Sequence, residues 1–169
     1  MGMIAYYMEA DRDIIERLKT KSADELFEEV EELDDAGELE IYDMDKMWDG
    51  LHFILTGVSA ATPIENNLLS EAIVGTAVFS DDESADFISY IYPERVNEIS
   101  DSLNDFDIDN ALSDFSPRVL AGNGIYPAAI WVENEKDSLK DELVTAFNEL
   151  KEFFAAMSDE YKGIIVSIY

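Results

Sequence analysis

The sequence predicts an α+β fold, a single compact domain in which a mixed β-sheet packs with helices. Strand-like apolar segments lie near both ends of the chain and in its middle, and amphipathic helical segments lie between them. These segments do not alternate regularly, as they would in a βαβ protein. The length of 169 residues is that of one domain, so residues 1–169 are expected to form a single unit.

The first part of the sequence predicts a strand followed by two helices. Residues 3–8 are apolar on both faces, which is typical of a covered strand. Asp11 is expected to cap a short helix, and Ser22 opens a second helix through the S-x-x-E spacing of a capping box. Gly37 is expected to end this second helix, whose outer face is almost entirely acidic. Residues 38–42 alternate polar and apolar side chains and predict a short edge strand or an extended loop.

The middle of the sequence carries weaker signals. Residues 58–86 contain loop-forming residues around Pro63, a helical turn or two over 68–73 and a short strand over 75–79. No long element is expected in this part of the chain.

The last part of the sequence predicts two strands and two longer helices. Residues 87–91 predict a strand, and Pro93 is expected at the first position of the helix that follows. Residues 107–136 are irregular because prolines and glycines interrupt them. Residues 137–157 give the clearest helical pattern, with apolar residues stepping by three or four. Residues 164–169 are apolar on both faces, which predicts a central strand.

Residues 44–55 are the most distinctive stretch, because they hold the only histidine and one of the two tryptophans. A helix here has an apolar stripe formed by Met44, Met47, Trp48, Leu51, Ile54 and Leu55. His52 falls at the edge of this stripe, and Asp45 and Asp49 lie just beyond it on the polar side. Gly50 costs the helix ~1 kcal/mol relative to alanine, so another backbone segment is expected to approach closely there.

The candidate ligand or partner site consists of His52, Trp48, Asp45, Asp49 and Tyr126. An imidazole between an indole and a carboxylate is expected to favour its protonated form and supplies one component of an acid–base pair. Two interpretations stay open. An accessible cleft at His52 and Trp48 favours a ligand site, whereas a His52 fully buried and hydrogen-bonded in the core excludes one. No catalytic residue is assigned.

Four segments in order along the chain carry a family resemblance. They are Met1-Gly2-Met3-Ile4, Asp45-Lys46-x-Trp48-x-Gly50-Leu51-His52-Phe53-x-Leu55-Thr56-Gly57, Tyr90-x-Tyr92-Pro93-Glu94-x-Val96, and Ile125-Tyr126-Pro127 followed by Trp131. Together with the closing helix and strand, they make essentially the whole chain resemble the YfbM-like family of bacterial proteins of unknown function. The resemblance implies a compact α+β fold and no reaction, and the strong acidity of this chain is not among the properties it implies.

The composition is strongly acidic and contains no cysteine. Asp and Glu number 39 against 11 Lys and Arg, a formal net charge of −28. Such a chain repels nucleic acid and anionic membranes, so we expect neither as a partner. No apolar run approaches the ~20 residues that cross a bilayer, and no basic segment marks a signal peptide. We therefore expect a soluble, cytoplasmic protein.

Motifs for cofactors and metals are missing or incomplete. The sequence has no P-loop, no G-x-G-x-x-G and no G-x-S-x-G, so no cofactor is expected. Asp105, Asp107 and Asp109 have the spacing of a calcium loop, but Asn110 replaces its turn glycine and Ser116 its bidentate glutamate. We interpret this segment as a solvated acidic loop and expect no metal.

Two functions fit these observations. The favoured hypothesis is a non-catalytic binding protein, such as an inhibitor or immunity factor for a basic protein partner. The alternative is a small-ligand-binding protein or an enzyme with a site around His52 and Trp48. The charge has a second interpretation, in which it serves only solubility or a salt-adapted proteome, and this interpretation stays open.

Overall fold

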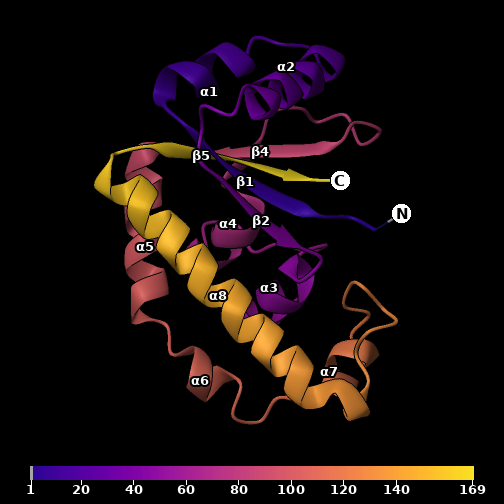
Figure 1. Cartoon of the computed structure of the whole chain (residues 1–169). Helices are drawn as coiled ribbons and strands as arrows, with labels where there is room; N and C mark the ends of the chain where they lie inside the picture. The colour runs from indigo at the N-terminus through magenta and orange to yellow at the C-terminus, as the bar shows by residue number, and fades with distance from the viewer. Residues whose placement is uncertain (1) are drawn as a thin grey trace.

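The computed structural model describes residues 2–169 as a five-stranded sheet between two layers of helices (Figure 1). The strand order is β2-β1-β5-β4-β3, with bounds β1 Ala5–Ala10, β2 Ile41–Asp45, β3 Ala77–Val78, β4 Phe87–Ile91 and β5 Gly163–Ile168. All of these pairings are antiparallel. The α+β class is confirmed, but the expectation of a mixed sheet is wrong. Burial patterns in a sequence indicate which strands are central, whereas strand direction depends on the end of the sheet to which each connection returns.

The central position predicted for the last strand is confirmed. Every residue of β5 is buried, and its neighbours on either side are β1 and β4. Ile164 and Val166 point into the larger core, while Ile165 points into the smaller core on the opposite face. A strand needs this apolar character at consecutive positions only when both of its faces are covered.

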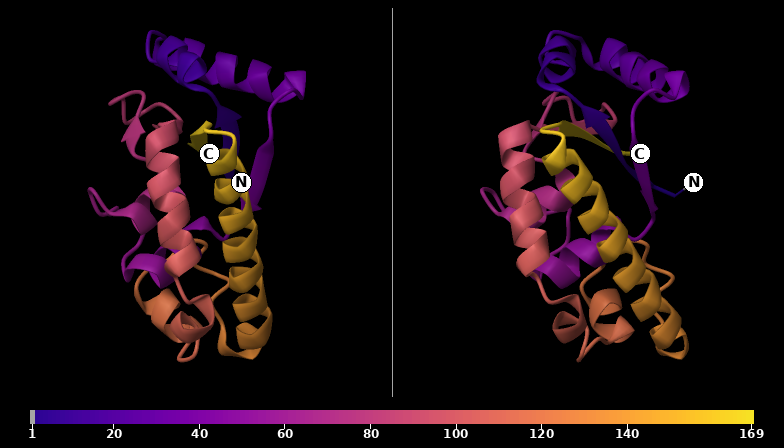
Figure 2. Two further views of the ribbon diagram at one scale, coloured as in Figure 1. Left: turned by 90° about the vertical axis from the view of Figure 1, so that its left-hand side faces the viewer. Right: turned by 60° about the vertical axis from the view of Figure 1, so that its left-hand side comes forward.

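The helices divide between the two faces of the sheet. Their bounds are α1 Arg12–Leu18, α2 Ala23–Ala36, α3 Trp48–Thr56, α4 Leu68–Val74, α5 Pro93–Asp105, α6 Ile108–Ala111, α7 Pro117–Gly122 and α8 Lys136–Asp159, with a short 3₁₀ helix at Glu133–Glu135. Helices α1 and α2 cover one face, and the other helices lie on the opposite side (Figures 1 and 2). Figure 2 shows α5 and α8 packed side by side. Within residues 2–169, none of the helices has the length and apolar character needed to cross a bilayer.

The predicted ends of the first two helices are confirmed. The Asp11 side chain accepts a hydrogen bond from the N–H of Ile14, which caps α1. Ser22 and Glu25 form both hydrogen bonds of a capping box at the start of α2. Gly37 ends α2 in a left-handed conformation with φ of 67°.

Two local predictions around α3 are wrong. The helix predicted from residue 44 begins at Trp48, because Met44 and Asp45 belong to β2 and Asp45 has a left-handed backbone (φ 57°). The close neighbour of Gly50 is a side chain, not a backbone segment: a Cβ added there would lie 2.5 Å from Cη2 of Trp131.

The segment 107–136, predicted to be irregular, contains the short helices α6 and α7.

Candidate functional site

His52 lies in the closed core and uses both of its ring nitrogens. The side chain is 0% exposed, with Nδ1 2.8 Å from the carbonyl oxygen of Val58 and Nε2 2.8 Å from Oγ of Ser70. A carbonyl only accepts, so Nδ1–H donates to Val58 and neutral Nε2 accepts the hydroxyl proton of Ser70. Ser70 Oγ in turn accepts the N–H of Ile64 at 3.0 Å. The chain of hydrogen bonds therefore joins α3, the 58–64 loop and α4.

The protonated form expected for His52 is not found, and of the two interpretations left open the buried, hydrogen-bonded one applies. Burial lowers the pKa of His52, and this effect outweighs the smaller upward effects of the Val58 carbonyl and the Asp49 charge. A His52 that is fully buried and hydrogen-bonded on both sides meets the condition that excludes a ligand site at this residue. A single-helix projection leaves this face of α3 open, whereas the 58–64 loop and α4 cover it.

Asp49 was expected on the polar side of the helix but is also buried, with 3% exposure. Its Oδ1 accepts the N–H of Ala60 at 2.7 Å and the hydroxyl of Ser59 at 3.0 Å, and its Oδ2 accepts the N–H of Tyr126 at 2.8 Å. These hydrogen bonds fasten two loops to α3. A carboxylate without a nearby cation can stay buried only when donors satisfy its oxygens in this way.

Trp48 and Tyr126 hold the start of the chain in place. Their rings stack with centroids 5.4 Å apart. Trp48 Nε1 donates to the carbonyl oxygen of Met3 at 3.1 Å, and the N–H of Met3 donates to the Tyr126 hydroxyl at 2.6 Å. The structure thus brings together four of the five predicted site residues, His52, Asp49, Trp48 and Tyr126, as a packing unit around α3.

Asp45 is the exception, because it lines an open groove between β2 and α8. We call this hollow the acidic groove; it has a volume of about 640 Å³ and is lined by Tyr42, Asp43, Met44, Asp45, Met47, Ser138, Asp141, Glu142, Thr145, Ala146 and Glu149. Five of these side chains are carboxylates and none is Lys or Arg. None of the five takes part in the ion pairs found within residues 2–169. The groove is therefore an anionic surface without internal counter-charges.

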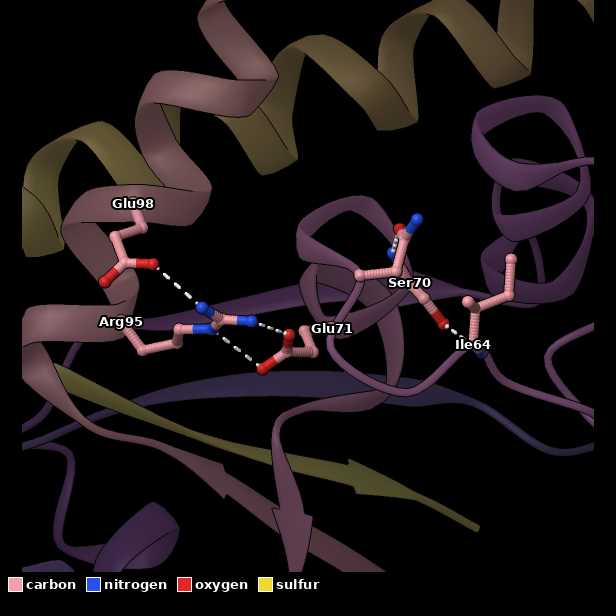
Figure 3. Close-up of polar contacts among 6 residues, drawn as sticks. Ile64, Ser70, Glu71, Arg95 and Glu98 are labelled. Carbon is pink, nitrogen blue, oxygen red and sulfur yellow. Dashed lines mark hydrogen bonds and ion pairs between the residues drawn. The ribbon is translucent and has the colours of Figure 1, made fainter.

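A second hollow, the α4 hollow, lies between the 63–66 loop, α4 and β3. Its volume is about 380 Å³, and Ser70 and Glu71 are part of its wall. The buried Glu71 carboxylate accepts hydrogen bonds from Nε of Arg95, at 3.0 Å, and from Nη2 of the same side chain (Figure 3). Arg95 also donates a hydrogen bond to Glu98. Two parallel bonds of this kind fix geometry as well as charge. This ion pair ties α4 to α5 and makes the wall rigid.

A third hollow, the turn hollow, lies at the turn between β3 and β4. It has a volume of about 390 Å³ and is lined by Val78, Ser80, Asp81, Asp82, Glu83, Ala85, Asp86, Phe87 and Ile88. Sequence reasoning missed both hollows beside β3, because the α4 hollow combines a loop, a helix and two strands, and the turn hollow depends on how the 80–86 turn folds. The only local signals were Pro63, the Asn66-Asn67 pair and the acidic turn before residue 87.

Few of the surface carboxylates are paired with a cation. The cations that form ion pairs within residues 2–169 lie in or beside α1 and at the start of α5; they are Arg12, Arg17, Lys19, Lys21 and Arg95. By contrast, residues 22–45 contain no Lys or Arg. The exposed carboxylates on the outer face of α2 are Glu28, Glu31, Glu32, Asp34 and Asp35. Most of the negative charge is therefore not neutralised within the fold.

Comparison with known proteins gives a family and no activity. The profile of the family described as "Domain of unknown function (DUF1877)" matches residues 1–167. Protein YfbM of Escherichia coli (strain K12) is 32% identical over 139 residues, which are 82% of this chain and 81% of that protein. The crystal structure of YfbM from Escherichia coli, described as a protein of unknown function, is similar with a TM-score of 0.76 and 27% identity, covering 98% of this chain and 99% of that one. The predicted resemblance is confirmed, and the chain belongs to the DUF1877 family of proteins of unknown function.

Proposed function

We propose that the protein is a non-catalytic interaction protein that binds a basic protein partner, as an inhibitor or immunity factor does. One observation carries this function: the acidic groove and the turn hollow are lined with carboxylates that take part in none of the ion pairs found within residues 2–169, and with no Lys or Arg. Concave surfaces are where a partner's side chains enter, and uncompensated charge there selects a partner of opposite sign. We also propose that the interaction takes place in the cytoplasm, which agrees with a sequence free of cysteine.

The concave position of unpaired carboxylates supports binding. None of the carboxylates of the acidic groove or the turn hollow takes part in the ion pairs found within residues 2–169. Carboxylates in a hollow are surrounded by less water than carboxylates on a convex surface, so their electrostatic field is stronger there. A basic side chain entering such a hollow replaces loosely held counter-ions, and its binding weakens as salt screens the charges.

The first experiment captures partners from an extract of the native cells with the tagged full-length protein. The expected result is a basic protein that is retained at ~0.15 M salt and released at ~1 M salt. An unrelated protein of equal negative charge serves as the control bait, because it reports simple ion exchange. Recovery of no partner beyond those of the control bait, or of partners that are not basic, would argue against the function.

The second experiment uses three charge-matched variants and the purified partner. Each variant replaces three Asp or Glu residues by Asn or Gln: in the turn hollow, Asp81, Asp82 and Glu83; in the acidic groove, Asp141, Glu142 and Glu149; and outside both, Asp101, Asp105 and Asp109. At least one of the first two variants is expected to bind more weakly than the third. Equal weakening of all three would show that only net charge matters and would contradict binding in a hollow.

A further inference from the structure

The two edges of the sheet differ in how open they are to another strand. At one edge, the β1–β2 pairing is irregular between Ala5 and Tyr6, and β2 carries the exposed charges Asp43 and Asp45. A bulge and edge charges are both devices that prevent a further strand from pairing. The β2 edge is therefore protected.

The strand at the opposite edge carries no charged residue and is only two residues long. Strand β3 consists of the exposed residues Ala77 and Val78, and the Val78 side chain is 41% exposed. Phe79 donates its N–H to the carbonyl oxygen of Ile88 at 3.1 Å, so the N–H of Val78 points away from β4 by the alternation of an antiparallel ladder. Within residues 2–169, β4 is the one strand that pairs with β3. The outer edge of β3 thus offers the peptide group of Val78 without any protecting charge on the strand itself.

The α4 hollow and the turn hollow both border the exposed residue Val78 of β3. Val78 and Phe87 line both the α4 hollow and the turn hollow. In the α4 hollow they are joined by Ile64, which is 38% exposed. Side chains of an extended segment point alternately to opposite faces, so every second side chain of a segment paired with β3 would face the α4 hollow. The edge and the two hollows form one docking geometry.

The entry to β3 is fixed by close packing. Gly75 has φ of 81°, and a Cβ added there would lie 2.2 Å from Oγ of Ser89. The Ser89 hydroxyl donates to the carbonyl oxygen of Val74 at 2.6 Å. These contacts hold the start of β3 close to β4, and the Glu71–Arg95 pair fixes the α4 wall (Figure 3). An edge held in place in this way loses little freedom when a segment pairs with it.

The charges around β3 indicate what kind of segment would pair there. Carboxylates border both hollows at Glu65, Asp81, Asp82, Glu83 and Asp86, and no Lys or Arg lines either hollow. A second copy of the chain would bring the same carboxylates together and is disfavoured by repulsion. A segment with Lys or Arg side chains gains attraction instead.

We infer that β3 accepts an extended segment of the protein partner as an added strand, with Lys or Arg side chains alternating with apolar ones. The backbone of β3 supplies the hydrogen bonds, Ile64, Val78 and Phe87 contact the apolar side chains, and the bordering carboxylates attract the basic ones. The basic character of the segment rests on the proposed function, whereas the pairing with β3 rests on the openness of the edge.

The test uses a displayed library of random short peptides, panned against the full-length protein. Selected peptides are then titrated against Val78→Pro, which removes the outward N–H, and against Val78→Lys and Val78→Glu, which leave the backbone unchanged. Ile41→Lys and Ile41→Glu on β2 are the matched controls, because Ile41 is a similarly exposed apolar residue on the other edge. Circular dichroism confirms that each variant is folded.

The expected peptides alternate basic and apolar residues and lose about tenfold in affinity with Val78→Pro, the loss expected for one backbone hydrogen bond. Val78→Lys should weaken binding more than Val78→Glu, and the Ile41 variants should change it little. Basic peptides that bind the Val78 variants as well as the wild type would overturn the β3 site and leave the proposed function standing. Peptides that are not basic but lose affinity in the Val78 variants would support the β3 site and overturn the proposed function. A library that yields no binder would overturn both the β3 site and the proposed function.

Discussion

His52 Nε2 and Ser70 Oγ lie 2.8 Å apart in the closed core, in a hydrogen bond that joins α3 to α4. A serine hydroxyl donating to a histidine also occurs in nucleophile–base pairs. Here both residues are 0% exposed and the other ring nitrogen bonds a backbone carbonyl, so both nitrogens of His52 are occupied within the fold. The pair connects α3 to α4, and its removal should lower the free energy of unfolding.

The buried position of His52 predicts how the free energy of unfolding depends on pH. The pKa of His52 is lowered in the folded protein, mainly by burial, so the unfolded chain binds this proton more readily. His52 therefore contributes stability that is present above the ordinary pKa of 6.5 and is lost as the pH falls toward the lowered value. Urea denaturation between about pH 7.5 and about pH 5.5 should show a decreasing free energy of unfolding.

The His52→Gln variant isolates this contribution from the many carboxylates. At neutral pH it should be less stable than the wild type by ~1–3 kcal/mol, because two buried hydrogen bonds cannot both be replaced. Its stability should fall less steeply over the same pH range. Parallel pH profiles for the two proteins would contradict the neutral, buried state of His52.

Gly50→Ala tests the contact with Trp131. Alanine normally stabilises a helix interior by ~1 kcal/mol relative to glycine. At this position its Cβ would lie 2.5 Å from Cη2 of the Trp131 ring, so we expect a net loss of ~1–3 kcal/mol in thermal or chemical unfolding. Gly122→Ala is the matched control, because Gly122 is helical with open space around it, and it should be neutral or stabilising. Similar effects of the two changes would exclude a tight contact at Gly50.

Asp49 and Asp45 provide a second matched pair. Asp49→Asn turns one acceptor oxygen into a donor facing the N–H groups of Ala60 or Tyr126, and should cost at least ~2 kcal/mol of unfolding free energy. Asp45 is exposed and has a left-handed backbone that asparagine adopts readily, so Asp45→Asn should change stability by less than ~0.5 kcal/mol. A mild effect at Asp49 would mean that its hydrogen bonds do not hold the two loops.

The net charge of −28 predicts that salt stabilises the fold. Repulsion between uncompensated carboxylates disfavours the compact state, and raising the ionic strength to ~0.15 M shortens the screening length to ~8 Å. The free energy of unfolding should therefore rise with added potassium chloride, which avoids the general stabilising effect of sulfate. Stability independent of chloride concentration would show that the carboxylates are spaced widely enough not to repel.

Local signals in the sequence predicted local structure well. The Ser22 capping box, the Gly37 cap and the central strand β5 are all found, because each depends on residues adjacent in the sequence or on continuous apolar character. Strand direction was not predictable from these patterns: a mixed sheet was expected, whereas all of the strand pairings are antiparallel.

The candidate site was less predictable because it depends on distant segments. The helical projection placed His52 and Asp49 at the margin of α3, where the 58–64 loop and Tyr126 in fact cover them. Of the predicted residues, Asp45 alone lies in an open hollow. The hollows beside β3 were missed, since their walls come from the 63–66 loop, α4 and the acidic turn.

Binding of a basic protein at an acidic hollow is tested most directly by the salt dependence of Kd for the purified partner. The affinity should fall steadily as chloride rises, and the dependence should be weaker when the carboxylates of one hollow are replaced than when Asp101, Asp105 and Asp109 are replaced. A Kd that does not change with salt, or the same dependence in every variant, would contradict it.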